Sequence, residues 1–310
     1  MIGVDVGFGD VKAVWVESGD FKYHKIPTAI KYASGNNGFT EENIYTFQGR
    51  EYLLGEQARF GAFSTRSFEF LKRYAGLFIF HVINEQGFNE KRVGLGLPLT
   101  WYSKKEEFLT ELTATVVNGS KLDIEPSLYP QAVGILLDYR LDIKGGTKQE
   151  TGRNGIIMDV GFNTVDVLCF ENGMAVRSDS ATLDKFGISR IITELIESIQ
   201  RNHNVGLSEQ EGKEVFQNGY ISIFGHKQDI SETIRNITEK YFDELMHRIK
   251  SNWENRLQRA DVLILAGGGA ISLKDYLPSE YSKIIQIPSM PEYSNARGYL
   301  KGLIAAGGGK

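Results

Sequence analysis

The sequence predicts an α/β protein built from two similar lobes, and three observations carry that prediction. The segment Asp-Val-Gly-Phe begins at Asp5 and again at Asp159. A short apolar run precedes each copy and an alternating run follows it, as expected for a strand, a tight turn and a second strand. The two copies are separated by about half of the 310-residue chain. The second half is therefore expected to repeat the plan of the first.

The composition is that of an ordinary globular protein, with 41% hydrophobic and 24% charged residues. The formal net charge of −4 argues against broad contact with nucleic-acid phosphates, so we expect no direct nucleic-acid binding. The single cysteine, Cys169, falls within a predicted strand and is expected to be a small buried side chain. Because no apolar run reaches the roughly 18 residues that cross a membrane, we expect a cytoplasmic protein without membrane contact.

The first half reads as strands followed by helices. Alternation and turn residues predict a β-meander over residues 2–30, with its first turn at Gly7 to Asp10. Pro130 is expected in the first turn of a helix over 130–141, a position that proline tolerates. The other expected elements are a polar loop at 33–43, two short strands over 45–58, mixed to helical structure over 62–90, a strand at 92–97 and a helix over 103–118.

The second half repeats this order after a polar, glycine-rich hinge at residues 144–154. A long helix is indicated by an apolar stripe that runs from Ile230 to Leu257. The glycine-rich end, residues 307–310, lacks the Ser or Thr and the helix of a phosphate loop and reads as a frayed tail. The expected elements are three strands over 155–177, a helix at 184–203, the long helix at 230–258, a buried strand at 261–266 and a last helix at 291–306.

The repeated motif carries groups that suit a phosphate and its metal. An apolar strand delivers Asp5 to a turn with Gly7 and Gly9, whose backbone can approach a ligand closely and present amide groups to an anion. Lys12 follows on the outgoing strand, within reach of a phosphate. Two carboxylates beside a polyphosphate are suited to hold Mg²⁺ through its water shell. The corresponding residues of the second copy are Asp159, Gly161, Thr164 and, in place of Lys12, Asp166.

Two further features bear on the site. The buried strand at 261–266 leads into Gly267, Gly268 and Gly269, which permit close backbone approach to a flat ligand such as a nucleobase. One aspartate turn alone would be an ordinary hairpin, but two such turns and a third glycine cluster favour a binding site. Gln131 has two interpretations that spacing leaves open: it orients an attacking water, or it is exposed and idle in the first turn of a helix.

These segments together resemble the superfamily of ATPases that contains actin, the DnaK-type chaperones and the sugar kinases. GVDVGFGDVKAV is similar to its first phosphate motif, MDVGFNTVDVLCFENG to the second and LILAGGGA to the adenosine motif. PQAVGILL and NARGYLKGL are similar to its two connecting helices. The five occur in the family's order over the whole chain, and the details look most like the prokaryotic actin-like proteins of the ParM/StbA type.

The resemblance implies an actin fold of two ribonuclease-H-like lobes, with ATP, or alternatively GTP, and Mg²⁺ in the cleft between them. Lobe I would comprise residues 1–150 plus 291–310, and lobe II residues 151–290. Asp5 and Asp159 would position Mg²⁺ and its waters, and Gln131 would orient the hydrolytic water, which makes these three the implied catalytic residues. The implied nucleotide-binding residues are Gly7, Gly9, Asp10, Lys12, Gly161, Thr164, Gly267, Gly268 and Gly269.

The sequence departs from the family's pattern at Phe8 and Phe162. In actin and ParM these loop positions are usually small or polar, so the first loop loses a hydroxyl contact. The resemblance implies weaker binding or slower turnover of the nucleotide as a consequence.

The function implied by the resemblance is that of a filament-forming ATPase. Such proteins often act in plasmid or DNA segregation through a DNA-bound adaptor, or as a cytoskeleton. Two alternatives from other classes remain: a small-molecule kinase of the same superfamily, and an ATP-binding regulator that does not hydrolyse its nucleotide. A chaperone would require a peptide-binding domain after the ATPase, and this sequence ends at Lys310.

Overall fold

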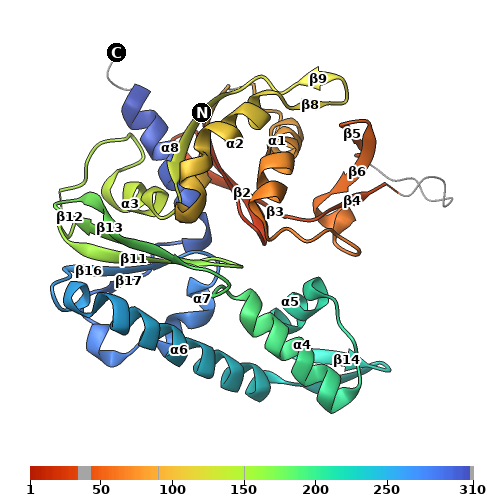
Figure 1. Ribbon diagram of the computed structural model, residues 1–310, viewed down its shortest axis with the longest axis vertical. Coiled ribbons are helices and arrows are strands. Elements are labelled where there is room, and N and C mark those ends of the chain that lie inside the picture. Colours follow the sequence, from red (N-terminus) through yellow and green to blue (C-terminus); the bar gives the residue numbers. More distant parts are fainter. Residues whose placement is uncertain (34–42, 90, 150, 308–310) are drawn as a thin grey trace.

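The computed structural model describes residues 1–33, 43–89, 91–149 and 151–307. The chain forms two α/β lobes, each built on a five-stranded sheet (Figure 1). The early strands and helices build lobe I, the middle of the chain builds lobe II, and the last helix packs against the sheet of lobe I. This agrees with the predicted fold class, whereas the predicted lobe boundaries stay predictions. Most of the loop predicted at 33–43, and residues 308–310 of the predicted tail, lie outside the described residues.

The sheet of lobe I has the strand order β10-β7-β1-β2-β3. Strands β1 to β3 form the predicted antiparallel meander, and β7 and β10 extend it in parallel. Every residue of β1 is buried, because the sheet is covered on both faces. The strands are β1 (Ile2–Val6), β2 (Asp10–Glu17), β3 (Asp20–Pro27), β7 (Arg92–Leu97) and β10 (Glu125–Pro130).

The sheet of lobe II repeats this plan, with the order β13-β12-β11-β16-β17. Asp5 lies across the ladder from Lys12 in lobe I, and Asp159 lies across from Asp166 in lobe II. The repeated motif therefore has one structural meaning, a strand that delivers an aspartate to a hairpin turn. The strands are β11 (Gly155–Val160), β12 (Val165–Glu171), β13 (Met174–Leu183), β16 (Val262–Ala266) and β17 (Ile285–Gln286).

A small second sheet and two helices complete lobe I. Its strands are β4 (Ile30–Tyr32), β5 (Tyr45–Phe47), β6 (Arg50–Leu54), β8 (Val116–Val117) and β9 (Ser120–Lys121), and the helices are α1 (Phe68–Glu85) and α2 (Lys105–Thr113). Short 3₁₀ turns lie at Gly55–Ala58 and Leu99–Lys104. The helix predicted over 103–118 is wrong beyond Thr113, because Asn118 and Gly119 both take positive φ and turn β8 back into β9.

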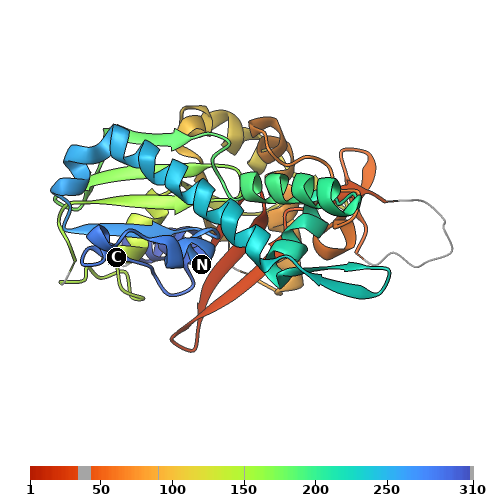
Figure 2. The same ribbon diagram turned by 90° about the horizontal axis from the view of Figure 1, so that it is seen from below.

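Lobe II carries its helices beside the sheet. They are α4 (Ser189–His203), α5 (Glu209–Asn218), α6 (Ser231–Gln258) and the short α7 (Ala270–Leu273), with 3₁₀ turns at Lys274–Tyr276 and Ser279–Tyr281. A hairpin of β14 (Tyr220–Ile223) and β15 (His226–Asp229) joins α5 to α6 and projects from the body in Figure 2. A capping box of Ser208 and Glu211 begins α5. Among the described residues, none of the helices has the length and apolarity to cross a bilayer.

Helices α3 (Val133–Arg140) and α8 (Ser294–Gly307), the latter preceded by a 3₁₀ turn at Pro291–Tyr293, cross between the lobes. They touch so closely that a Cβ on Gly298 would lie 1.7 Å from the carbonyl oxygen of Gly134. The helix predicted from Pro130 is wrong at its start. Pro130 pairs with Leu97 as the last residue of β10, and Ala132 takes a φ of 64°, so the helix begins only at Val133.

Candidate functional site

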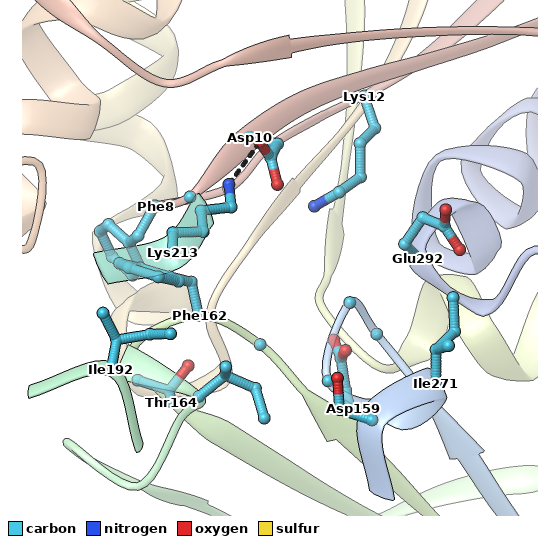
Figure 3. Close-up of a pocket in the computed structure, with 18 of the residues that line it drawn as sticks. Phe8, Asp10, Lys12, Asp159, Phe162, Thr164, Ile192, Lys213, Ile271 and Glu292 are labelled. Carbon is cyan, nitrogen blue, oxygen red and sulfur yellow. Dashed lines mark hydrogen bonds and ion pairs between the residues drawn. The ribbon is translucent and has the colours of Figure 1, made fainter. Parts of the chain in front are cut away.

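A cavity of about 500 Å³ lies between the two lobes. Figure 3 shows Asp10 and Lys12 on one side of it and Asp159 and Thr164 on the other. The lining includes all twelve site residues expected from the sequence: Asp5, Gly7, Gly9, Asp10, Lys12, Gln131, Asp159, Gly161, Thr164, Gly267, Gly268 and Gly269. The structure thus brings together groups that are spread over most of the chain.

The turn after β1 is fixed by its own closing hydrogen bond and by two hydrogen bonds from outside it. The amide of Gly7 donates to the carbonyl of Asp10 at 3.2 Å. The hydroxyl of Thr28 donates to the carbonyl of Gly7 at 2.6 Å, and that of Thr65 to the carbonyl of Phe8 at 2.7 Å. Satisfied carbonyls hold the turn in one conformation, so its backbone faces the cavity without rearrangement.

The turn after β11 has the same closing bond, from the amide of Gly161 to the carbonyl of Thr164 at 2.9 Å. The start of α4 packs onto it: the amide of Ser189 donates to the carbonyl of Phe162 at 2.8 Å. The two turns are therefore equivalent hairpins. Hydrogen bonds from neighbouring segments fix each of them, and each lines the cavity.

The aspartates that end β1 and β11 are buried, with 5% of Asp5 and 7% of Asp159 exposed. The amide of Gln131 donates to Asp5 at 3.0 Å, and the amide of Asn295 donates to Asp159 at 2.7 Å. Asn295 also accepts from the backbone of Ala132 at 3.1 Å. One linked set of amides, from the segments that begin α3 and α8, therefore holds both carboxylates in place.

Gln131 itself is buried, which excludes the interpretation of an exposed, idle glutamine. It lies in the turn between β10 and α3 rather than within a helix. Its backbone N–H donates to the carbonyl of Leu97 at 2.7 Å. Its side chain reaches the cavity because the left-handed Ala132 reverses the chain directly after it.

Burial and mutual repulsion disfavour the charged forms of Asp5 and Asp159, and a bound cation would offset both effects. Burial, and then the charge of Asp5, raises the pKa of Asp159 to about 6. Burial also raises the pKa of Asp5 against the opposing effects of Lys12 and Gln131. Among the described residues no group of three or more metal-ligating side chains is present. The donor set of two carboxylates suits Mg²⁺ held through its waters and a phosphate rather than by a protein cage.

Asp166, which stands in the repeated motif but is not among the expected nucleotide-binding residues, lies across the ladder from Asp159 and lines the cavity. It is 2% exposed and accepts a hydrogen bond from the hydroxyl of Thr182. Burial, and then the charge of Asp159, raises its pKa to about 7.

We expect Asp166→Asn to raise the free energy of unfolding of the metal-free protein by about 2–4 kcal/mol at pH 8. Because the pKa of Asp166 in the folded protein is about 7 and its ordinary value is 3.8, wild type loses stability as the pH rises between these values. Asparagine keeps the acceptor for Thr182 and removes the charge. Urea unfolding in EDTA at pH 4.5 and pH 8 measures the gain, which should be small at the lower pH.

The exposed Asp184→Asn is the matched control, with an expected change within about 0.5 kcal/mol at either pH. An Asp166→Asn protein no more stable than wild type at pH 8 would contradict the burial argument.

Three lysines, Lys12, Lys25 and Lys213, add positive charge to the lining of the cavity. Lys213, on α5, donates to Asp10 at 2.8 Å across the cleft (Figure 3). Asp10, expected to contact a nucleotide, is thus held by lobe II. A cavity lined by both lysines and carboxylates suits an anion that carries a divalent cation.

Helix α5 makes further ion pairs to lobe I, from Arg59 to Glu214 at 2.9 Å and from Arg66 to Glu209. Phe162 packs against the cores of both lobes and lies 5.6 Å from the guanidinium of Arg66. Phe8 meets Trp101 edge-on at 5.6 Å. The two phenylalanines that depart from the family's pattern therefore have packing partners.

The three glycines after β16 differ in how closely other atoms pack against them. Gly267 takes a φ of 85°, and a Cβ there would lie 2.5 Å from Oδ1 of Asp159. A Cβ on Gly269 would lie 2.5 Å from Val160, whereas one on Gly268 would meet nothing within 4 Å. Gly268 therefore leaves open space at the cavity. Apolar groups continue the wall beyond it, and they are Ile188, Ile192, Phe216, Ile234, Ile271 and Tyr276.

Lys213, Asn295 and Asp166 were not among the expected site residues. The sequence held a signal for two of them, since Asp166 stands in the repeated motif and Asn295 in the segment NARGYLKGL. Lys213 has no such signal, because its partner Asp10 lies 203 residues earlier in the chain.

Comparison with solved structures finds the same fold in several actin homologues. The archaeal actin homologue Ta0583 in complex with ADP is 19% identical, with a TM-score of 0.77 over 97% of this chain and 98% of that one. A ParM from a 15-stranded filament of Clostridium botulinum is 20% identical, with a TM-score of 0.76 over 97% of both chains. Bacillus thuringiensis ParM with AMPPNP is 17% identical, with a TM-score of 0.68 over 97% of both chains.

A comparison with curated proteins finds no match. Two family models match consecutive parts of the sequence. Residues 3–134 match the N-terminal domain of actin-like proteins, and residues 157–279 match the C-terminal domain of the archaeal MreB-like actin homologue. The matched residues together make up most of the chain and include both aspartate turns and the glycine cluster. The chain is a member of the actin-like superfamily.

Proposed function

We propose that this protein binds ATP with Mg²⁺ between its lobes, hydrolyses it, and assembles into filaments in a nucleotide-dependent manner. One observation carries the proposal: two equivalent aspartate turns, one from each lobe, face a single cavity whose lining also includes three lysines. Relatives with the same fold are described with ADP, with AMPPNP and as a filament, which supports nucleotide binding and self-association here.

Most of the expected site residues have a role in this proposal. Asp5 and Asp159 hold the waters of Mg²⁺, which supplies charge neutralisation on the phosphate chain when bound. The glycine turns and Lys12 hold the β- and γ-phosphates, together with Thr164. Gln131 orients the attacking water, and Gly268 with the apolar wall beyond it receives the base. GTP is the alternative to ATP.

We further propose a cytoplasmic protein that moves or positions DNA through a DNA-bound adaptor, or that acts as a cytoskeletal element. The net charge of −4 favours an adaptor over direct contact with DNA.

The test combines binding, turnover and assembly in one preparation. Titration calorimetry with ATP or GTP, in Mg²⁺ or in EDTA, should show metal-dependent binding. Phosphate release should follow, and light scattering with electron microscopy should show filaments with ATP or AMPPNP and fewer with ADP. Binding without phosphate release would favour the non-hydrolysing regulator. Monomers in every nucleotide state would remove the filament proposal.

A further inference from the structure

The tip of the β14–β15 hairpin carries an aromatic side chain that the fold does not use. Phe224 is 99% exposed, more than any other large hydrophobic residue among those described. It also takes a φ of 49°, in the left-handed region that a bulky side chain disfavours. With Gly225 at φ 81° it forms a two-residue turn, where asparagine would satisfy the backbone at less cost. Neither burial nor turn geometry explains a phenylalanine here.

The hairpin presents this side chain on a fixed arm. Ile221 is buried in the core of lobe II and anchors the base of the arm. Four pairs of residues join β14 and β15, and the ammonium of Lys227 lies 4.1 Å from the ring of Tyr220 along the side of the arm. Figures 1 and 2 both show the hairpin at the end of lobe II away from β12 and β13.

A second, mostly apolar cavity of about 300 Å³ lies between lobe I and β13. Leu99, Pro130, Val133 and Leu168 form much of its wall, and the exposed Ala181 lies at its rim on β13. Arg177, also exposed and lining the cavity, makes no side-chain hydrogen bond or ion pair to another described residue. A free guanidinium beside an apolar recess is suited to the face of an aromatic ring.

We propose that Phe224 inserts into this cavity of a second copy of the chain, with the ring beside Arg177. The proposal rests on the self-association proposed above and names the surfaces that carry it. The arm is fixed at the end of lobe II remote from β13, so the cavity of the same chain is out of its reach. A contact between two different surfaces of identical chains can be repeated from one copy to the next. It forms a ring if the rotation between copies closes, and an open filament if it does not. One inserted ring is an anchor within a larger contact, not a complete interface.

Phe224→Asn tests the arm, because asparagine suits the left-handed turn and is expected to keep the hairpin folded. The critical concentration for ATP-dependent assembly, measured by sedimentation, should rise at least tenfold, while ATP binding stays within twofold of wild type. Phe60→Asn, which removes an exposed aromatic residue from lobe I, is the matched control and should leave assembly unchanged.

Substitutions on β13 test the cavity independently of the hairpin. Ala181→Trp fills it from the rim and should raise the critical concentration to a similar degree, whereas Ser178→Trp, on the same strand but outside the cavity lining, should not. A mixture of Phe224→Cys and Ala181→Cys proteins should give a disulfide-linked heterodimer under assembly conditions. Neither variant alone should, since the native Cys169 is fully buried.

The outcomes separate the two proposals. Two results would overturn the docking of Phe224 and leave the filament proposal standing. The first is that wild type forms filaments and Phe224→Asn assembles normally. The second is that filaments form but the mixed cysteine variants do not cross-link. Wild type that stays monomeric in every nucleotide state, with no cross-link in the mixture, would overturn both.

Discussion

Replacing Gln131 with alanine is expected to slow ATP hydrolysis about 100-fold and to leave ATP affinity within about threefold. The side chain donates its amide to Asp5 at 3.0 Å. A carboxylate only accepts hydrogen bonds, so the nitrogen of Gln131 is fixed toward Asp5 and its carbonyl oxygen is left for another donor. In the proposed mechanism, a water held by that oxygen would be oriented for attack, whereas other groups of the cavity would bind the phosphates and the base.

Gln217→Ala is the matched control for this variant. Gln217 also lines the cavity but belongs to α5, on the other lobe from Asp5, and its side chain is exposed. Single-turnover phosphate release should be slow in Gln131→Ala and near normal in Gln217→Ala, with fluorescent-nucleotide titration giving the affinities. Unchanged turnover in Gln131→Ala would remove this residue from the hydrolytic step, and a loss confined to affinity would assign it to binding.

The local parts of this site could be predicted from the sequence. A buried strand, an aspartate and a glycine turn lie within a few residues of one another, so Asp5 and Asp159 were visible as two copies of one pattern. The glycine cluster at Gly267 followed from the same strand-to-turn pattern. The structure adds that a Cβ on Gly267 would lie against Asp159, which spacing along the chain does not reveal.

The errors arose where distant contacts decide local structure. Pro130 is compatible with the first turn of a helix, but pairing of β10 with β7 makes it the end of a strand. The left-handed conformation of Ala132 then sets where Gln131 points, and no pattern of apolar residues encodes that. At residues 116–121 the turn-forming pair Asn118-Gly119 decides the structure, because it closes a hairpin and the helix before it ends at Thr113.

The interaction between α3 and α8 has the largest expected effect on stability. Asp138, on α3, accepts two hydrogen bonds from Arg297 at 2.7 and 2.6 Å and one from Lys301 at 2.6 Å. All three residues are at most 5% exposed. Although burial opposes the effect, the hydrogen bonds and charge of Arg297, and then those of Lys301, lower the pKa of Asp138. The carboxylate is therefore the counter-charge of two buried cations on the other helix.

Asp138→Asn is expected to lower the free energy of unfolding at pH 7 by about 3–5 kcal/mol, because it leaves two buried cations without a counter-charge. Since the pKa of Asp138 is depressed in the folded protein, the stabilisation is present above its ordinary value of 3.8 and is lost as the pH falls through the folded value. Urea unfolding at pH 7 and in acid measures both effects. The exposed Asp243→Asn, on α6, is the control and should change stability by less than about 0.5 kcal/mol.

A second variant tests whether charge or packing is responsible. Adding Lys301→Met to Asp138→Asn removes one of the two uncompensated cations at similar volume, so it should recover part of the lost stability. If the double variant is less stable than Asp138→Asn, the loss comes from packing at the helix crossing rather than from charge. In that case the close contact of Gly134 and Gly298, where the backbones of α3 and α8 leave no room for a Cβ, holds the two helices together instead.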